Sequence, residues 1–79
     1  MDRMNLFELK TGDVIYLKDK EGYKNSIFKF GGTYKYKKGK VTGFINSIWK
    51  IIRLKIELEA ENGELFYIYE HDLEYWEKV

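Results

Sequence analysis

The most regular stretch of the chain alternates apolar and polar residues with a period of two. It covers residues 52–59 and sets four apolar side chains between four charged ones, namely Ile52, Leu54, Ile56 and Leu58 against Arg53, Lys55, Glu57 and Glu59. This period places successive side chains on opposite faces of a β-strand. We therefore predict a strand whose four apolar residues share the interior side of a sheet.

The segment after this strand predicts a β-hairpin. Asn62-Gly63 is a turn signal, and residues 65–69 form a second strand. A two-residue loop would leave Phe66 and Ile68 in solvent, whereas a three-residue loop over 61–63 would bury both. We expect the three-residue loop, because exposing two large apolar side chains is unfavourable.

This choice of loop also determines the outer face of the hairpin, since a slip of one residue exchanges the two faces of a strand. It requires Gly63 in a left-handed conformation and turns Tyr67 and Tyr69 outward. It produces two inward cross-strand pairs, Leu58 with Phe66 and Ile56 with Ile68.

The remaining segments predict three more strands, a long loop and a helical turn. Thr11-Gly12-Asp13 is a turn signal before an apolar run, and Gly43 sits where a bulge or a bend is easily formed. No stretch of ten or more residues has helical periodicity. We expect strand one at 13–18, a long loop over 19–38 in which Ile27, Phe28 and Phe30 fold over the core, strand two at 38–45, a turn at Asn46-Ser47, a helical turn at 70–73 and a closing strand at 75–79.

Length and composition limit the chain to one small domain. Its 79 residues, 44% of them apolar, support one thin core, and Trp49 and Trp76 are expected in that core or at its rim. The absence of cysteine excludes disulfides, CxxC redox sites and thiolate zinc sites. Apolar runs are only a few residues long, so we expect a soluble, cytoplasmic protein with no membrane partner.

Four segments, taken in order, resemble the SH3-like small β-barrels of the KOW and Tudor kind. They span residues 9–77 and read LKTGDVIYL, KGKV, the alternating strand and ENGELFYIYEHDLEYW. The chain looks especially like small SH3-like barrel proteins of phages and prophages. The resemblance implies an all-β fold over residues 1–79: a five-stranded SH3-like barrel, with a long loop between strands one and two and a short helical turn before the last strand. It also implies a binding role, without catalytic residues.

The net charge of +1 conceals a strong asymmetry along the chain. Residues 1–55 carry 13 Lys and Arg against 5 Asp and Glu, while residues 56–79 carry 1 against 8. Each region can steer a partner of opposite charge. The asymmetry is equally typical of opposite charges paired across neighbouring strands.

The strongest candidate for nucleic-acid binding is the segment 29–40, which interleaves cations, aromatic residues and glycines. Lysines attract phosphates, and aromatic rings can stack on unpaired bases. In this interpretation Lys29, Lys35, Lys37, Lys38 and Lys40 contact phosphate, while Tyr34 and Tyr36 stack. The alternative interpretation is a solvated lysine-rich loop whose two tyrosines cap the end of the barrel.

A second candidate surface is the outward row of Tyr67 and Tyr69 beside Glu57 and Lys55. Tyrosine is a frequent anchor of protein interfaces, because it offers a large contact area at a small entropy cost. The alternative is cross-strand packing of aromatic rings over neighbouring side chains.

Residues suited to catalysis or metal binding are sparse. His71 is the single histidine and stands beside Glu70 and Asp72, where a solvated residue in an acidic turn is the simpler interpretation. Glu57 and Glu59 share a face that we expect to be wet, which leaves them poor general acids. We therefore expect no catalytic residues, no cofactor and no metal site.

These observations predict a non-enzymatic binding module and rank two partner classes almost equally. A protein partner or accessory role of the phage or prophage type stands slightly ahead, because the acidic half of the chain would repel a nucleic-acid backbone. Nucleic-acid binding through the 29–40 segment is the alternative. A structural or self-assembling subunit, joined head to tail by complementary patches, is a third class. The sequence leaves the oligomeric state open.

Overall fold

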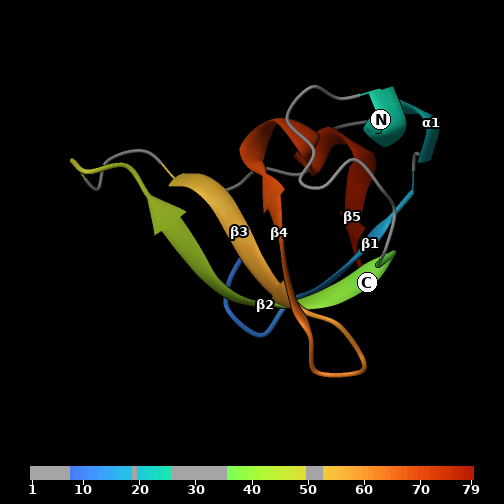
Figure 1. Ribbon diagram of the computed structural model, residues 1–79, viewed down its shortest axis with the longest axis horizontal. Coiled ribbons are helices and arrows are strands. Elements are labelled where there is room, and N and C mark those ends of the chain that lie inside the picture. Colours follow the sequence, from blue (N-terminus) through green and yellow to red (C-terminus); the bar gives the residue numbers. More distant parts are fainter. Residues whose placement is uncertain (1–7, 19, 26–35, 50–52) are drawn as a thin grey trace.

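The computed structural model describes residues 8–18, 20–25, 36–49 and 53–79 of the chain. Five strands, one α-helix and one 3₁₀ helix occupy these residues (Figure 1). Their bounds are β1 Val14–Leu17, α1 Lys20–Asn25, β2 Lys38–Asn46, β3 Arg53–Glu59, β4 Leu65–Tyr69, η2 Glu70–Tyr75 and β5 Trp76–Lys78. The predicted all-β class, its five strands and the helical turn before the last strand are confirmed.

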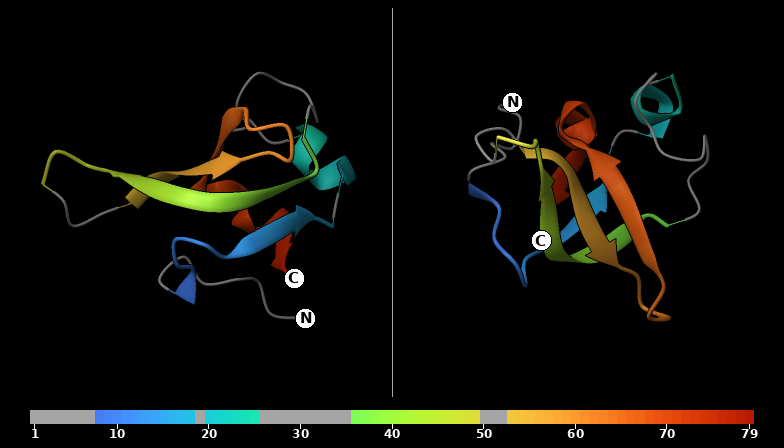
Figure 2. Two further views of the ribbon diagram at one scale, coloured as in Figure 1. Left: turned by 90° about the horizontal axis from the view of Figure 1, so that it is seen from below. Right: turned by 60° about the vertical axis from the view of Figure 1, so that its left-hand side comes forward.

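The five strands form one antiparallel sheet in the order β4-β3-β2-β1-β5. β2 is the longest strand and pairs with β1 near its start and with β3 along the rest of its length. Figure 2 shows it as a long curved strand that carries one end of the β2/β3 hairpin away from β1 and β5. β4 and β5 are the two edges, and within the described residues no ladder joins them, so the sheet is not closed.

The core lies on the inner face of this curved sheet, where η2 and α1 help to enclose it. Trp76 is 1% exposed, as expected for a residue that supplies bulk to a small core. Phe44, Phe66 and Tyr75 pack against the cluster while partly buried. The buried apolar members are Leu9, Ile15, Leu17, Tyr23, Val41, Ile56, Leu58, Ile68, Leu73 and Trp76.

The hairpin between β3 and β4 has the predicted register. Leu58 lies opposite Phe66, and Ile56 lies opposite Ile68. The backbone N–H of Ala60 donates to the Glu64 carbonyl at 2.8 Å, which closes the ladder on a three-residue loop. Gly63 within that loop has a φ of 88°, the left-handed conformation that glycine adopts without strain.

Two bulges interrupt the pairing of β2 with β3. The first lies between Val41 and Gly43, at the glycine where a bulge or bend was predicted. The second lies near the far end of the hairpin, where Ile45 pairs with Lys55 and the next residue of β2 pairs with Arg53. Leu54 is the extra residue there, and a bulge breaks the alternation of a strand.

This second bulge corrects one prediction about the interior. Leu54 is 48% exposed and does not share the buried side with Ile56 and Leu58. The alternation of apolar and polar residues continues through this part of the sequence, but the paired backbone does not. Ile52 lies outside the described residues.

Helix α1 falls within the predicted long loop and was not predicted. It has only six residues, which is too short for helical periodicity to show in the sequence. Its Tyr23 is buried and meets Tyr75 and Trp76 edge-on, with ring centroids 6.4 and 5.9 Å away. The apolar island at residues 27–30 lies outside the described residues, so its position over the core stays a prediction.

Gly39 in β2 leaves room for the ring of Phe66 on the inner face. A Cβ atom at this position would lie 2.7 Å from Cζ of Phe66 and 3.1 Å from Cβ of Leu58. The ring is held between Tyr36, at 5.1 Å between centroids, and Trp76, at 6.3 Å. It therefore has little freedom to move aside.

We predict that Gly39→Ala lowers the free energy of unfolding by about 1–3 kcal/mol, the usual effect of an added group in a packed core. Gly43→Ala is the matched control, because a Cβ there would meet no atom within 4 Å, and its effect should stay within about 0.5 kcal/mol. Urea unfolding followed by far-UV circular dichroism measures both. Equal effects of the two substitutions would refute the close contact at Gly39.

Candidate binding surface

The outer face of β2, β3 and β4 gathers the predicted protein-binding residues. The ladders set Glu57 opposite Tyr67, and Lys55 opposite Tyr69. Lys55 also lies opposite Ile45 of β2, so that Ile45, Lys55 and Tyr69 form one row across the three strands. The predicted outward direction of Tyr67 and Tyr69 is thus present, and both side chains are half-buried.

Glu57 is bound by hydroxyl groups from both neighbouring strands. Tyr67 Oη donates to Glu57 Oε2 at 2.9 Å, and Thr42 Oγ1 donates to Glu57 Oε1 at 2.8 Å. The hydrogen bond to Glu57, together with burial and the carboxylate's charge, raises the pKa of Tyr67 above its usual value of 10.0. This part of the face is held together by its own contacts, and Glu57 is not the solvated carboxylate that the sequence suggested.

Two cations on β3 lie over aromatic rings. The Lys55 ammonium is 5.1 Å from the ring centroid of Tyr67 and 5.9 Å from that of Tyr69. The Arg53 guanidinium is 4.1 Å from the ring centroid of Phe44. Cation–π contacts of this kind hold a charged group in a defined position near the surface.

Beyond this face, the far end of the β2/β3 hairpin exposes apolar side chains. Ile48 is 89% exposed and Trp49 is 73% exposed, and both lie in the turn after β2. Ile45 and Leu54 flank them on the two strands and are also exposed. We call these four residues, Ile45, Ile48, Trp49 and Leu54, the hairpin tip.

The hairpin tip was not predicted, and Trp49 in particular does not lie in the core. The hairpin extends past the enclosed part of the sheet, as Figure 1 shows, and Ile48 and Trp49 in the turn after β2 are exposed. The available signal was an Asn46-Ser47 turn followed directly by Ile48 and Trp49. Large apolar residues in a turn are candidates for a contact surface, because turns usually carry polar residues.

The predicted nucleic-acid segment is only partly brought together. Lys37, Lys38 and Lys40 are exposed, as phosphate contacts require. Lys38 and Lys40 border a hollow of about 280 Å³ that is also lined by Val14, Glu59, Ala60 and Glu61. Lys40 lies directly opposite Glu59 in the ladder, which is the pairing of opposite charges across neighbouring strands considered above.

Tyr36, one of the two predicted stacking residues, packs against the domain. Its ring lies 5.1 Å from that of Phe66, and its hydroxyl donates a hydrogen bond to Glu64. A ring in this position covers the edge of the core, which agrees with the capping interpretation. Lys29, Tyr34 and Lys35 lie outside the described residues.

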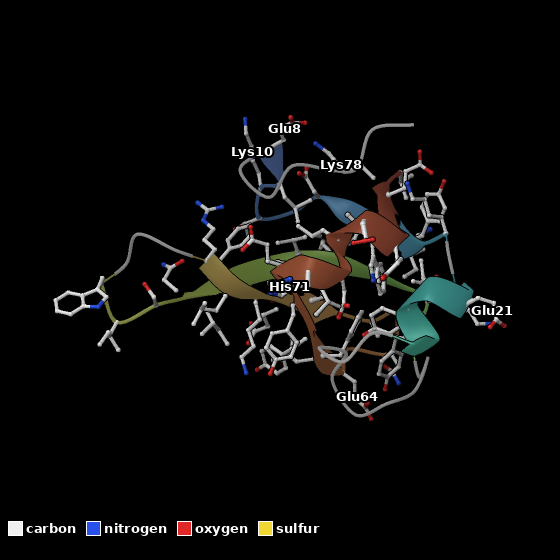
Figure 3. All side chains as sticks on the ribbon, turned by 90° about the horizontal axis from the view of Figure 1, so that it is seen from above. Glu8, Lys10, Glu21, Glu64, His71 and Lys78 are labelled. Atoms are coloured by element: carbon white, nitrogen blue, oxygen red, sulfur yellow. The ribbon has the colours of Figure 1, made fainter. Side chains whose placement is uncertain are left out.

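Lys78 near the C-terminus contacts the segment that precedes β1. Lys78 lies 3.4 Å from Asp13 and within 3.5 Å of the Glu8 carbonyl, and Figure 3 shows Lys78 on the same side of the molecule as Glu8 and Lys10.

His71 is exposed on η2. Among the described residues no three acidic or histidine side chains are grouped so as to hold a metal ion. No helix in the described part of the chain is long and apolar enough to cross a membrane.

We predict that Glu57→Gln lowers the pKa of Tyr67 toward 10.0, because it removes the charge that favours the protonated hydroxyl. Tyr16 provides the matched control: a 2.7 Å hydrogen bond to Glu77 raises its pKa, so Glu77→Gln should lower the pKa of Tyr16 alone. A pH titration of tyrosine ¹³Cζ shifts by NMR separates the two residues.

The raised pKa also has a consequence for stability. A group whose pKa is higher in the folded state stabilises that state fully below its unfolded pKa and loses this effect as the pH rises through the folded value. On the alkaline side, the contact between Tyr67 and Glu57 should therefore persist until the pH rises above about 10. If Tyr67 titrates alike in wild type and Glu57→Gln, the hydrogen bond is absent in solution.

Comparison with known proteins adds no further assignment. Neither a protein-family model nor a curated protein nor a solved structure matches this chain.

Proposed function

We propose that this chain is a non-enzymatic binding module whose partner is another protein, and that the hairpin tip is its principal contact. The observation that carries the proposal is the exposure of Ile48 and Trp49 at 89% and 73% on a hairpin that extends beyond the core. Apolar side chains gathered in this way are typical of surfaces that become buried in a complex.

The energetics of burial support a contact of this kind. Burying a large aliphatic side chain contributes about 1.5–3 kcal/mol, and tryptophan is among the residues that dominate protein interfaces. The tip is presented by the longest ladder of the sheet, that of β2 with β3. A contact residue carried on paired strands loses less entropy on binding than one on a free loop.

The row of Ile45, Lys55 and Tyr69 extends the surface from the tip across the outer face. This row joins the newly found tip to Tyr69, one of the tyrosines predicted to bind a protein. Glu57 and Tyr67 hold the adjoining part of the face in place through their hydrogen bond. We infer that these two residues position the surface and contribute less of the contact.

We also infer that the sheet corresponds to the five-stranded SH3-like barrel of the KOW and Tudor kind, and that the protein is a cytoplasmic accessory protein of the phage or prophage type. Five antiparallel strands with a 3₁₀ turn before the last one support the barrel. The quoted sequence segments support the kinship. The binding role is independent of both inferences, since it rests on the tip.

A second candidate function is nucleic-acid binding through the 29–40 segment, supported by the exposure of Lys37, Lys38 and Lys40. The packing of Tyr36 on Phe66 places this candidate below the protein partner, because it engages one of the two rings proposed to stack. Self-association through complementary charged patches is the third candidate.

The proposal predicts that Ile48→Ser combined with Trp49→Ser abolishes partner capture. Immobilised wild type should retain specific proteins from an extract of the source cells, and the double variant should retain at least tenfold less of them, because replacing an interface tryptophan commonly removes 2 kcal/mol or more of binding energy (~30-fold). Unfolding curves should be unchanged, since neither side chain is buried.

The comparison variant is a triple substitution, Lys37→Ala, Lys38→Ala and Lys40→Ala, which removes positive charge and leaves the tip intact. It should capture the same proteins as wild type. An unchanged set of proteins on the tip variant would refute the proposal. Salt-sensitive binding of oligonucleotides that only the lysine variant loses would favour the second candidate instead.

A further inference from the structure

We propose that the hairpin tip binds an acidic amphipathic segment of its protein partner, whose apolar side chains cover the tip and whose carboxylates face Arg53 and Lys55. This inference rests on the proposed function and specifies the chemistry of the partner. Its basis is the combination of exposed apolar groups and fixed positive charge at one end of the hairpin.

The sequence around the tip carries positive charge without any negative charge. No Asp or Glu occurs from residue 22 to residue 56, a span that contains nine Lys and Arg. Arg53 and Lys55 of this span belong to β3, directly after the turn. A docking surface of this composition favours a partner with carboxylates around an apolar centre.

Arg53 and Lys55 are held in position before a partner arrives. The Arg53 guanidinium lies 4.1 Å from the centre of the Phe44 ring, and Lys55 lies over the rings of Tyr67 and Tyr69. A cation fixed over an aromatic ring loses little side-chain entropy when a carboxylate binds to it. The charges thus flank the exposed apolar residues at defined points.

Glu57 lies on the same face as Lys55, and hydroxyl groups of neighbouring strands bind its carboxylate. Glu57 follows Lys55 by two residues, farther from the turn, and accepts hydrogen bonds from the hydroxyls of Thr42 and Tyr67. These bonds hold its carboxylate toward its own cross-strand neighbours.

The form of the surface favours a protein segment over a lipid bilayer or a nucleic acid. The surface continues from the tip along the row of Ile45, Lys55 and Tyr69, so an extended or helical segment can follow it, whereas a flat bilayer would meet the tip alone. Three of the four tip residues are aliphatic, and bases stack on aromatic rings. A nucleic acid that bound through its phosphates would leave those aliphatic side chains exposed to water.

The test is a selection of random linear peptides displayed on phage. Peptides are selected on wild type and depleted on the Ile48→Ser, Trp49→Ser variant. Binding of the enriched peptides is then titrated by the fluorescence anisotropy of a labelled peptide, which works equally in every variant. In wild type, tryptophan fluorescence also reports on the tip, because Trp49 is 73% exposed while Trp76 is 1% exposed. Trp49→Phe should remove the blue shift that peptide binding produces, which assigns the signal.

We expect enriched peptides that combine Asp or Glu with large apolar residues. Their affinity should fall at least tenfold in the Ile48→Ser, Trp49→Ser variant. It should fall severalfold in Arg53→Gln, Lys55→Gln and with rising salt. Lys37→Gln, Lys38→Gln removes the same charge elsewhere on the surface and should leave the affinity unchanged.

Two other outcomes would overturn the inference and separate it from the proposed function. Tip-dependent peptides without acidic residues, or with affinities indifferent to Arg53 and Lys55, would refute the acidic partner and leave the tip as a protein-binding surface. If no tip-dependent peptide is enriched while the tip binds vesicles of phosphatidylcholine and phosphatidylglycerol, or a single-stranded oligonucleotide, both the inference and the protein partner are wrong.

Discussion

β3 is paired on both sides, with β2 and with β4, and its alignment against these neighbours decides which side chains are enclosed. The turn after it holds Gly63 in a left-handed conformation, which sets the alignment with β4. Leu58 then faces Phe66 in the interior while Glu57 faces Tyr67 on the outer side. Because a slip of one residue would exchange these two faces, the core and the outer face are consequences of the same alignment.

The two ends of β3 have different surroundings. Toward its end, Ile56 and Leu58 are buried between neighbouring strands and under η2. Toward its beginning, the bulge at Leu54 breaks the alternation, and the hairpin continues past the core. Ile48 and Trp49, at 89% and 73% exposed, therefore do not belong to the core formed by the described residues. We propose that they serve to bind a partner.

The sequence predicted the parts of this structure that depend on regular pairing between strands, namely strand positions and cross-strand register. The period of two located β3, and the exclusion of Phe66 from solvent selected the hairpin loop and the outward tyrosines. The bulge at Leu54 was missed because an alternating pattern assumes that every residue is paired. Trp49 was assigned to the core or its rim because a small core needs bulky side chains. The sequence does not indicate how far the β2/β3 hairpin extends beyond that core. The contact of Tyr67 with Glu57 followed from the register, but the second bond from Thr42 depends on the bulge at Gly43.

The most direct test of this alignment is the pattern of nuclear Overhauser effects between Hα protons of β3 and β4. Since Ala60 and Glu64 form a hydrogen-bonded pair, the pairs Glu59 with Leu65 and Glu57 with Tyr67 are the close, non-hydrogen-bonded ones. We predict strong Hα–Hα effects for both pairs. Contacts from Leu58 to Tyr67 in their place would show the slipped register, and would contradict both the enclosed core and the outer face described here.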